Sequence, residues 1–299
     1  MNDDHLILAF DDYAAPARRL AEAAGYSFSL IDVHRFPDGE SRLRLPVDLP
    51  EQVVLCRSLN DPNEKLVELI LAAQHLRDQG VRQLLLVAPY LCYMRQDKAF
   101  HPGEVVSQGI IGKLLAGYFD GVITVDAHLH RIHHLQDALP MKTAINLTAT
   151  HPMALFLEQQ GLKPLLIGPD GESEQWVASI ARHESLEYCI AHKERLGDRQ
   201  VKVSLPTCDY GGKDIILVDD VASTGRTLEA AARQLQDFSP ASVSVMVTHA
   251  LFLGNALQHL KAAGVENIWS CDSIPHPSNR IHLDQLLGET LRDCLDQLP

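Results

Sequence analysis

Short aliphatic runs alternate with amphipathic stretches along the whole chain, and this alternation restricts the fold more than any other feature. The runs at Leu84–Ala88 and Ile215–Val218 contain no polar residue, which is typical of strands buried on both faces of a parallel sheet. The stretches between such runs place aliphatic residues at helical spacing, as at 66–76. The pattern therefore predicts an α/β protein with central parallel sheets covered by helices.

The elements expected in the first half are strands at 6–10, 53–56, 84–88 and 122–125, with helices near 66–76 and 110–118. A Pro-Asp-Gly turn followed by alternating polar and apolar residues predicts a hairpin at 35–45. In the second half, strands are expected at 165–168, 188–191, 215–218, 243–249 and 267–271, and helices at 153–160, 174–183, 227–238 and 283–297. The polar stretch 191–203 predicts a mobile loop.

Each half contains an aliphatic strand that runs directly into a polar loop of the size that holds a phosphate. This similarity indicates two duplicated domains, although no strict sequence repeat is present. We expect the domains at 1–144 and 145–281, with a final helix at 282–299 packing on the first domain.

The charge of the chain excludes some partners. There are 39 acidic and 26 basic side chains, and the net charge is -13. Broad binding to nucleic acid or anionic membranes needs a positive field, so neither is expected. The aliphatic runs are much shorter than the ~20 residues of a membrane span. An acidic N-terminus without a signal peptide and six singly scattered cysteines favour a cytoplasmic protein with reduced thiols.

The most specific motif is the segment IILVDDVASTGRT at 215–227. Two acids, Asp219 and Asp220, follow the strand, and a loop then leads into a helix; the loop residues are Ser223, Thr224, Gly225, Arg226 and Thr227. Backbone N–H groups, hydroxyls and a helix N-terminus together favour a phosphate monoester. The acids are expected to bind ribose hydroxyls, directly or through a metal. The alternative is a capped helix with solvated acids, but buried acids without a ligand would be costly.

Other polar residues cluster at predicted turns and strand ends. Asp38 and Glu40 flank Gly39 in the hairpin, where two carboxylates can accept hydrogen bonds from an exocyclic amine and Phe36 offers a ring face. After the strand at 84–88, the chain continues into a loop that contains Arg95, Gln96 and Asp97. An arginine can pair with phosphate there. Read alone, the first segment is more typical of a plain hairpin turn, and the second is equally compatible with a solvated charged loop.

Histidines and cations supply two further candidate sites. His128 follows the strand at 122–125, with His130, His133 and His134 close behind, so a zinc site is one alternative. No cysteine lies nearby, and a magnesium ion would instead be bound through phosphates, carboxylates and water. Lys193 and Arg195, in the stretch 191–203, can neutralise charge on a transferred phosphoryl group. Read alone, these residues are more typical of a charged loop that only aids solubility.

The loop at 219–227 resembles the 5-phosphoribosyl-1-pyrophosphate loop of the type I phosphoribosyltransferase fold. Further blocks occur in the order found in the ribose-phosphate pyrophosphokinase (phosphoribosyl pyrophosphate synthetase) family: Phe36–Glu40, Tyr93–Asp97, Asp126–His128, Gly168–Asp170 and Lys193–Arg195. Ser223 stands where the commonest loop has a third acid and Arg226 where it has a second glycine, and Gly171-Glu172-Ser173 also departs from many relatives. These departures are more similar to the shorter, archaeal-type branch.

The resemblance implies two phosphoribosyltransferase-type (Rossmann-like) domains related by internal duplication, and ribose-phosphate diphosphokinase activity with Mg²⁺ as cofactor. It places adenine at Phe36, Asp38, Gly39 and Glu40, near a subunit contact of a homo-oligomer. It assigns Arg95, Gln96 and Asp97 to the ATP site, His128 to Mg-ATP and Asp170 to the metal and ribose. Ribose 5-phosphate is assigned to 219–227, and Lys193 and Arg195 form the catalytic pair. His130, His133 and His134 are left as solvated surface.

Two other functions fit parts of the sequence. A phosphoribosyltransferase would use the same ribose loop but would need no ATP site at 36–40 and 95–96. A non-catalytic regulatory paralogue of the synthetase would keep the fold and lose the cations. Lys193, Arg195 and His128 are all present, which favours the enzyme.

Overall fold

A computed structural model describes residues 2–129, 131–132, 134–195 and 201–295 of the chain. It divides into two compact units. Unit 1 comprises the chain up to Leu147 together with the C-terminal segment from Leu283, and unit 2 comprises Thr148–His282. The chain passes from unit 1 to unit 2 immediately after strand β8 (Thr143–Leu147).

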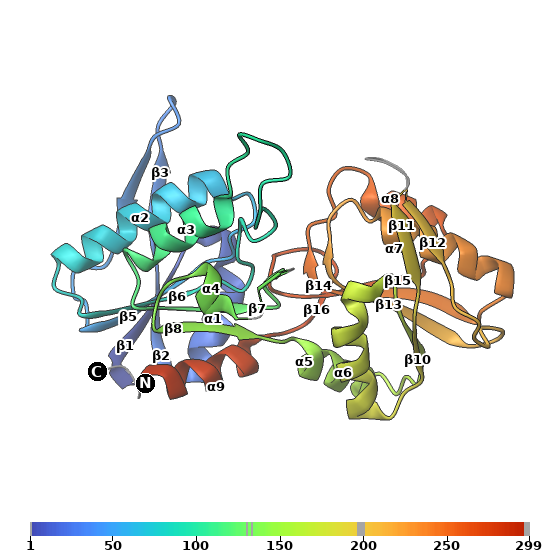
Figure 1. Cartoon of the computed structure of the whole chain (residues 1–299). Coiled ribbons are helices and arrows are strands. Elements are labelled where there is room, and N and C mark those ends of the chain that lie inside the picture. Colours follow the sequence, from blue (N-terminus) through green and yellow to red (C-terminus); the bar gives the residue numbers. More distant parts are fainter. Residues whose placement is uncertain (1, 130, 133, 196–200, 296–299) are drawn as a thin grey trace. The chain divides into compact units, whose positions relative to one another are not determined.

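Unit 1 is built on a parallel sheet of strand order β2-β1-β5-β6-β7-β8 (Figure 1). Its other strands are β1 (Asn2–Ala9), β2 (Tyr26–Leu30), β5 (Gln52–Cys56), β6 (Gln83–Val87) and β7 (Gly121–Val125). The central strands β5, β6 and β7 are aliphatic and almost completely buried, as parallel strands covered on both faces must be. In Figure 1, α2 (Pro62–Asp78) and α3 (Ser107–Ala116) lie on one side of this sheet, and α1 (Ala14–Ala24) and α9 (Asp284–Leu295) lie on the other.

The helices of unit 1 are η1 (Asp11–Tyr13), α1 (Ala14–Ala24), α2 (Pro62–Asp78), α3 (Ser107–Ala116), α4 (Leu135–Ala138) and α9 (Asp284–Leu295). Helix α9 returns from the end of unit 2 to pack on α1. A Cβ atom at Gly288 would lie 3.1 Å from the Cβ of Ala23, so the glycine permits this close approach. The side chain of Arg292 donates to the carbonyl oxygen of Ala23.

An antiparallel hairpin interrupts unit 1 between β2 and β5. Its strands are β3 (Asp32–Arg35) and β4 (Ser41–Arg44), and its tip projects beyond α2 in Figure 1. Val33 and Leu43 pack against the unit 1 core, whereas the whole turn at 36–40 is exposed. The structure thus contains the hairpin that the Pro-Asp-Gly turn predicted.

Unit 2 repeats this plan, with a parallel sheet of strand order β10-β9-β13-β14-β15-β16. The strands are β9 (Leu165–Gly168), β10 (Tyr188–Ile190), β13 (Asp214–Ala222), β14 (Ser242–Ala250), β15 (Asn267–Cys271) and β16 (Asn279–Ile281). The helices are α5 (Thr150–Gln159), η2 (Gly171–Ser173), α6 (Glu174–Glu184), α7 (Arg226–Leu235), η3 (Gln236–Phe238) and α8 (Ala256–Ala262). The two sheets therefore have the same connectivity, which confirms the predicted pair of parallel α/β domains.

A second hairpin lies between β10 and β13, at the place that β3 and β4 occupy in unit 1. It consists of β11 (His192–Arg195) and β12 (Val201–Ser204), and it corrects the loop predicted for 191–203. Val203 is buried in the unit 2 core, so this apolar contact anchors a segment whose polar composition is typical of a loop. Residues 196–200 lie outside the described part of the chain.

Each unit has its own aliphatic core. One cluster of buried side chains runs from Leu6 to Ala144 in unit 1, and a separate cluster runs from Leu165 to Val265 in unit 2. Among the described residues, no helix combines the length and the apolar character that crossing a membrane would require.

Candidate functional site

Strained backbone marks the loops that follow the carboxyl ends of the strands. Left-handed φ angles occur at Asp61 after β5 (49°), Tyr93 after β6 (60°), Asp126 after β7 (41°) and Phe252 after β14 (36°). A non-glycine residue in this region costs on the order of 1–3 kcal/mol, and such strain concentrates at functional sites. Ligands of open α/β sheets bind outside the carboxyl ends of the strands. Both units therefore carry candidate sites at this edge.

In unit 2, the predicted phosphate loop joins β13 to α7. Gly225 is the N-cap residue of α7 and has a φ of 69°, which favours glycine at this position. Two backbone bonds of 2.8 Å fix the start of the loop, from the N–H of Phe252 to the oxygen of Ala222 and from the N–H of Leu253 to the oxygen of Ser223. The first N–H groups of a helix have no partner within it, so they can donate to an anion.

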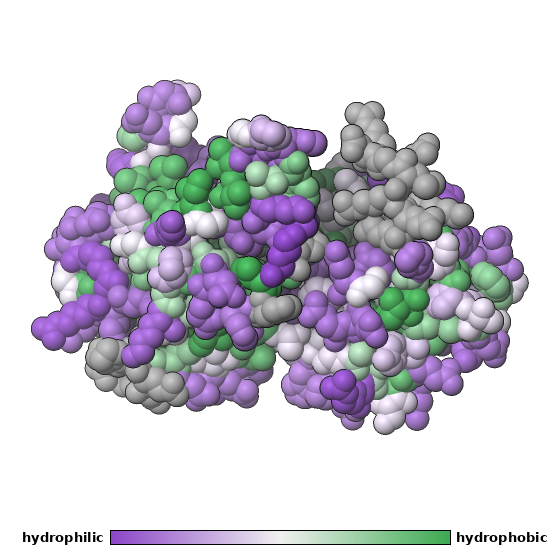
Figure 2. Space-filling model, viewed as in Figure 1, coloured by the Kyte–Doolittle hydropathy of each residue, from purple (hydrophilic) through white to green (hydrophobic). Residues whose placement is uncertain are grey.

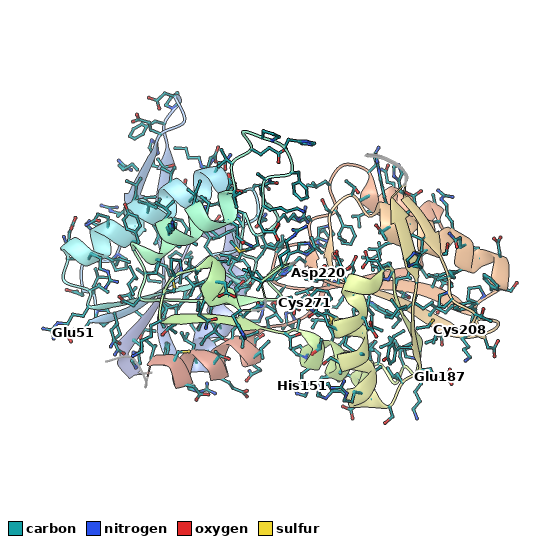
Figure 3. The ribbon with its side chains drawn as sticks, in the orientation of Figure 1. Glu51, His151, Glu187, Cys208, Asp220 and Cys271 are labelled. Atoms are coloured by element: carbon teal, nitrogen blue, oxygen red, sulfur yellow. The ribbon has the colours of Figure 1, made fainter. Side chains whose placement is uncertain are left out.

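Three acids gather beside this loop, Asp170 after β9 and Asp219 and Asp220 on β13. Burial, followed by the charges of Asp220 and Asp170, raises the pKa of Asp219 well above its ordinary value. Asp219 accepts a hydrogen bond from the N–H of Asp220 at 3.0 Å, and Asp220 from that of Val221 at 2.7 Å. Figure 3 marks Asp220. Mutually repelling carboxylates of this kind fit a hard divalent cation, which binds through oxygen.

The unusual block after Asp170 has a local structural role. The Asp170 carboxylate accepts from the backbone N–H groups of Glu172 and Ser173, at 3.1 and 3.3 Å, and so caps η2. The hydroxyl of Ser173 donates back to the Asp170 carbonyl oxygen at 2.6 Å. A Cβ atom at Gly168 would lie 2.4 Å from the Ser173 hydroxyl oxygen, so this position requires glycine. Ser173 and Gly168 therefore fix the direction in which Asp170 leaves β9.

The two candidate catalytic cations lie on β11 of the second hairpin. Lys193 pairs with Val203 and Arg195 with Val201 in the antiparallel register. Their backbone therefore belongs to an ordered strand of unit 2 and not to the loop predicted from the sequence. The acids, the phosphate loop and this strand all belong to unit 2.

In unit 1, the five residues from Phe36 to Glu40 form the exposed turn of the first hairpin. The N–H of Phe36 donates to the Glu40 oxygen at 2.8 Å, and that of Gly39 to the Phe36 oxygen at 2.9 Å. The N–H of Glu40 donates to the Asp38 carboxylate at 3.2 Å. The ring of Phe36 is 41% exposed, and the ring of His34 meets it edge-on at a centroid distance of 4.9 Å. The turn thus presents an aromatic ring and two acids to solvent.

The predicted loop residues Arg95, Gln96 and Asp97 follow β6 and are held by a residue that sequence reasoning missed. The side-chain amide of Gln108, at the start of α3, donates to the Met94 oxygen at 3.1 Å, and its backbone N–H donates to the Gln96 oxygen at 3.2 Å. These two bonds bracket the exposed Arg95. Gln108 is 5% exposed. Nothing in the sequence around it indicates that this polar side chain is buried.

Asp97 is already engaged within unit 1. Its nearly buried carboxylate forms an ion pair of 2.6 Å with Arg131, a residue that the sequence analysis did not single out. The same guanidinium lies 5.7 Å from the ring of Phe100. The pair joins the loop after β6 to the loop after β7, so Asp97 is a loop-bridging residue in this structure.

His128 lies in the loop after β7, half-buried, two residues beyond the strained Asp126. The side-chain oxygen of Asn146 on the neighbouring strand β8 accepts the N–H of Ala127 at 2.8 Å and holds this turn. His134 is exposed and precedes α4, in agreement with its assignment to the surface. His130 and His133 lie outside the described residues. Within the described ranges, neither His128 nor His134 belongs to a group of three or more side chains that could hold a metal ion.

The shared topology allows the two units to be compared position by position. Ala9 on β1 and Gly168 on β9 are equivalent, because each accepts a 2.8 Å hydrogen bond from the residue after the second strand. Ala9 is the register partner of Cys56, and Gly168 lies opposite Val218 if the register of β9 and β13 is continued by one residue. Arg57, the next residue in unit 1, therefore occupies the position of Asp219 in unit 2. Arg57 is buried and bonded to Asp12 at 3.0 Å. Unit 1 thus has a paired arginine at the position where unit 2 has an acid that could bind an added cation.

Comparison with known proteins agrees with this architecture. Residues 6–118 match the model of the N-terminal domain of ribose phosphate pyrophosphokinase, and residues 153–286 match that of the phosphoribosyl transferase domain. The crystal structure of phosphoribosylpyrophosphate synthetase from Mycobacterium smegmatis superposes with a TM-score of 0.81 at 20% identity, covering 99% of this chain and 100% of that one. The fold therefore defines a protein of two phosphoribosyltransferase-type domains.

Similar sequences narrow this class to one family. The ribose-phosphate pyrophosphokinase of Methanopyrus kandleri is 31% identical over 96% of this chain and 99% of its own length. Ribose-phosphate pyrophosphokinase 2 of Archaeoglobus fulgidus is 34% identical over 92% of this chain and 96% of its own length. The chain belongs to the ribose-phosphate pyrophosphokinase family of enzymes, and the predicted similarity to the archaeal-type branch is confirmed.

Proposed function

We propose that the chain transfers the β,γ-pyrophosphoryl group of ATP to the 1-hydroxyl of ribose 5-phosphate. The hydroxyl oxygen attacks the β-phosphorus, the bond from that phosphorus to the α,β-bridging oxygen breaks, and the hydroxyl proton is lost. The products are phosphoribosyl pyrophosphate and AMP. In-line transfer of this kind depends on positioning and on neutralising charge.

The observation that carries this proposal is the pairing of an anion loop with an acidic cluster at one strand end of unit 2. Ser223–Thr227 would bind the 5-phosphate through helix N–H groups and hydroxyls, with Arg226 adding a cation. Asp219 and Asp220, shortly upstream on β13, would bind the ribose hydroxyls. A sugar phosphate offers a phosphate for the loop and hydroxyls for the acids in one molecule, whereas an inorganic anion would leave the acids without a ligand.

Unit 1 supplies the groups that suit ATP. Phe36 would stack on adenine while Asp38 and Glu40 accept hydrogen bonds from its exocyclic amine, with Gly39 permitting the turn through its φ of 93°. Arg95 is exposed and can pair with phosphate oxygens, and Gln96 lies beside it. We assign Asp97 to the same site as a support, because its carboxylate is held by Arg131.

Magnesium is the metal that we propose. The acids of unit 2 suit it chemically, since Asp170, Asp219 and Asp220 offer carboxylate oxygens, and burial, followed by the charges of Asp220 and Asp170, raises the pKa of Asp219. In unit 1, we assign His128 to the binding of Mg-ATP. When bound, the ion would neutralise charge on the phosphate oxygens. Asp170 is held in place for this role by its bonds to the backbone of η2.

Lys193 and Arg195 are the catalytic cations in this proposal. They would donate to the oxygens of the transferred group as negative charge develops on the leaving AMP. Strand pairing with β12 gives their backbone a defined register, so less conformational entropy has to be lost on reaching the transition state than from an irregular loop. A regulatory paralogue would have no use for these two residues.

We propose a homo-oligomer with the ATP site near a subunit contact. In Figure 2, hydrophobic side chains gather over α2 and α3 of unit 1, near the base of the hairpin. Val67 and Leu71 on α2 and Ile110 on α3 are 58%, 47% and 57% exposed. Clustered aliphatic side chains of this kind mark protein interfaces, and a second copy covering them would adjoin the turn 36–40, to which we assign adenine.

The cysteines support our proposal that the enzyme works in the cytoplasm. All six are free thiols, as reduced compartments favour. Burial raises the pKa of Cys92 to about 12, and burial together with Cys208 raises that of Cys189 to about 12. Thiols of such high pKa are protonated at neutral pH and resist oxidation.

One assay separates this function from its rivals. Purified protein with ATP, Mg²⁺ and ribose 5-phosphate should form AMP, and omission of the sugar phosphate should abolish AMP formation. A phosphoribosyltransferase would instead form a nucleotide from phosphoribosyl pyrophosphate and a base without ATP. A non-catalytic paralogue would form neither product, and ADP as the product would overturn the proposed reaction.

A further inference from the structure

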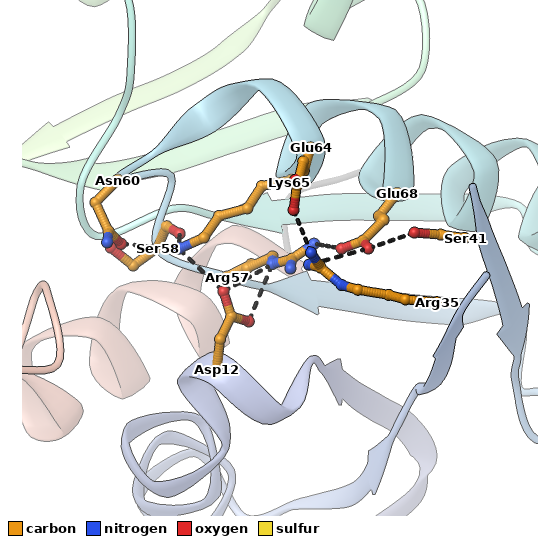
Figure 4. A network of polar contacts seen from close by, with 9 residues as sticks. All are labelled: Asp12, Arg35, Ser41, Arg57, Ser58, Asn60, Glu64, Lys65 and Glu68. Carbon is orange, nitrogen blue, oxygen red and sulfur yellow. Dashed lines mark hydrogen bonds and ion pairs between the residues drawn. The ribbon is translucent and has the colours of Figure 1, made fainter. Parts of the chain in front are cut away.

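A buried carboxylate on α2 contacts the two residues that flank the turn 36–40. Glu68 is 1% exposed and lies beneath the first hairpin (Figure 4). One of its oxygens accepts the hydroxyl of Ser41 at 2.7 Å and lies 3.5 Å from the guanidinium of Arg35. Arg35 is the last residue before the turn 36–40, Ser41 is the first after it, and the two are register partners. A single acid thus contacts both strands at the base of the turn.

The other oxygen of Glu68 is tied into the body of unit 1. It lies 2.8 Å from the buried guanidinium of Arg57, whose Nε donates to Asp12. Asp12 also pairs with Lys65 at 2.9 Å, and Lys65 donates to the oxygen of Ser58 at 2.8 Å. The network therefore connects the hairpin to α2, to the loop after β5 and to the loop after β1.

Arg57 is the residue that occupies the position of Asp219, so this network fills the place in unit 1 that corresponds to the ribose and metal site of unit 2. The Arg57 guanidinium also stacks over the ring of Phe10, 3.9 Å from its centroid. A cation that is buried, paired and stacked does not suit a second cation or a sugar at the same place. The structural role left for Arg57 is to hold the Glu68 carboxylate.

We propose that Glu68 is a positioning residue for ATP, which it serves by fixing the orientation of the turn 36–40; this inference rests on the proposed adenine site. The hairpin has few other anchors, because its strands are four residues each and the turn is fully exposed. Val33 and Leu43 hold its lower part by apolar contact, which is not directional. At the level of the turn, the exposed Glu64 pairs with Arg35 alone. Glu68 is the buried acid that contacts both Arg35 and Ser41.

Steady-state kinetics of Glu68→Gln test the proposal. The substitution keeps the side-chain volume and removes the charge that Arg35 and Arg57 share. We expect the KM for ATP to rise ~10-fold while kcat and the KM for ribose 5-phosphate stay within ~2-fold, because the turn contacts only ATP. Ser41→Ala removes one hydrogen bond to the Glu68 carboxylate and leaves its ion pairs with Arg35 and Arg57 in place, so it should raise the KM for ATP ~5-fold.

Glu64→Gln is the matched control, since Glu64 lies one helical turn away on α2 and also pairs with Arg35, but at an exposed position. Exposed ion pairs contribute little, so its kinetics should match the wild type. An unchanged KM for ATP in Glu68→Gln and Ser41→Ala, or equal rises in both KM values, would overturn the positioning role. Asp38→Asn identifies the other failure: if it leaves the KM for ATP unchanged, the adenine assignment falls, and the positioning role with it.

Discussion

The assignment of the 5-phosphate to the loop before α7 can be tested at a single backbone position. Gly225 has a φ of 69°, and a Cβ atom built there meets only ordinary contacts, the nearest being the Ala256 Cβ at 3.5 Å. Gly225→Ala therefore adds no clash, and its cost is that of a left-handed alanine, ~1 kcal/mol. In a unit of this size, such a loss lowers the melting temperature by roughly 3–5 °C.

The same substitution should have a larger effect on one substrate. If the loop relaxes to relieve the strain, one charge-assisted hydrogen bond to the 5-phosphate is lost, which is worth about 1.5–3 kcal/mol. The KM for ribose 5-phosphate should then rise roughly 10- to 100-fold, with little change in the KM for ATP.

Gly212 provides the control, because it lies in a turn of unit 2 before β13 with a φ of 66°, and a Cβ atom at this residue would have no neighbour within 4 Å. Gly212→Ala should lower the melting temperature by a similar amount and leave both KM values unchanged. Differential scanning fluorimetry and initial-rate kinetics on both variants measure these effects. Equal changes in the KM for ribose 5-phosphate in the two variants would refute the assignment of the phosphate.

Three further predictions address the catalytic cations, the acids and the metal. Lys193→Ala should lower kcat by at least ~100-fold with little change in KM, since a residue acting in the transition state affects kcat; near-normal turnover would refute the role. The raised pKa of Asp219 means that the folded protein binds this proton more tightly than the unfolded chain, so stability falls as pH rises from about 3.9 through the raised value. Asp219→Asn should accordingly raise the melting temperature at pH 7 in metal-free buffer and abolish activity; a variant less stable than wild type at pH 7 would contradict this. EDTA should abolish activity and millimolar Mg²⁺ restore it, His128→Ala should weaken Mg-ATP use, and His134→Ala should not; one tightly held zinc per chain would oppose the magnesium assignment.

The fold was predictable from the sequence where burial is complete. Strands such as β5, β6 and β13 are continuous aliphatic runs because both faces of a parallel sheet are covered. The edge strands β2 and β8 were not predicted, since their half-exposed residues mix polar with apolar types. The sequence predicts a loop in place of the hairpin β11–β12, because Val203 is the one apolar residue of these two strands that packs in the described core of unit 2.

Motifs gave the candidate ligand-binding residues but not the residues that support them. Glu68 and Gln108 are polar residues on helices, where the ordinary expectation is exposure, yet both are buried. Arg131 and Asn146 act through contacts with segments distant in the sequence, on Asp97 and on the backbone of Ala127. Such contacts depend on tertiary packing, which local patterns do not encode.

The fate of the γ-phosphate of ATP tests the proposed reaction most directly. The purified enzyme would be incubated with Mg²⁺, ribose 5-phosphate and ATP labelled with ³²P at the γ position, and the products separated by ion-exchange chromatography. Because the β,γ-pyrophosphoryl group moves as a unit, the label should appear in phosphoribosyl pyrophosphate, in equal amount to the unlabelled AMP. Label in a ribose bisphosphate, accompanied by ADP, or label in orthophosphate would contradict the account.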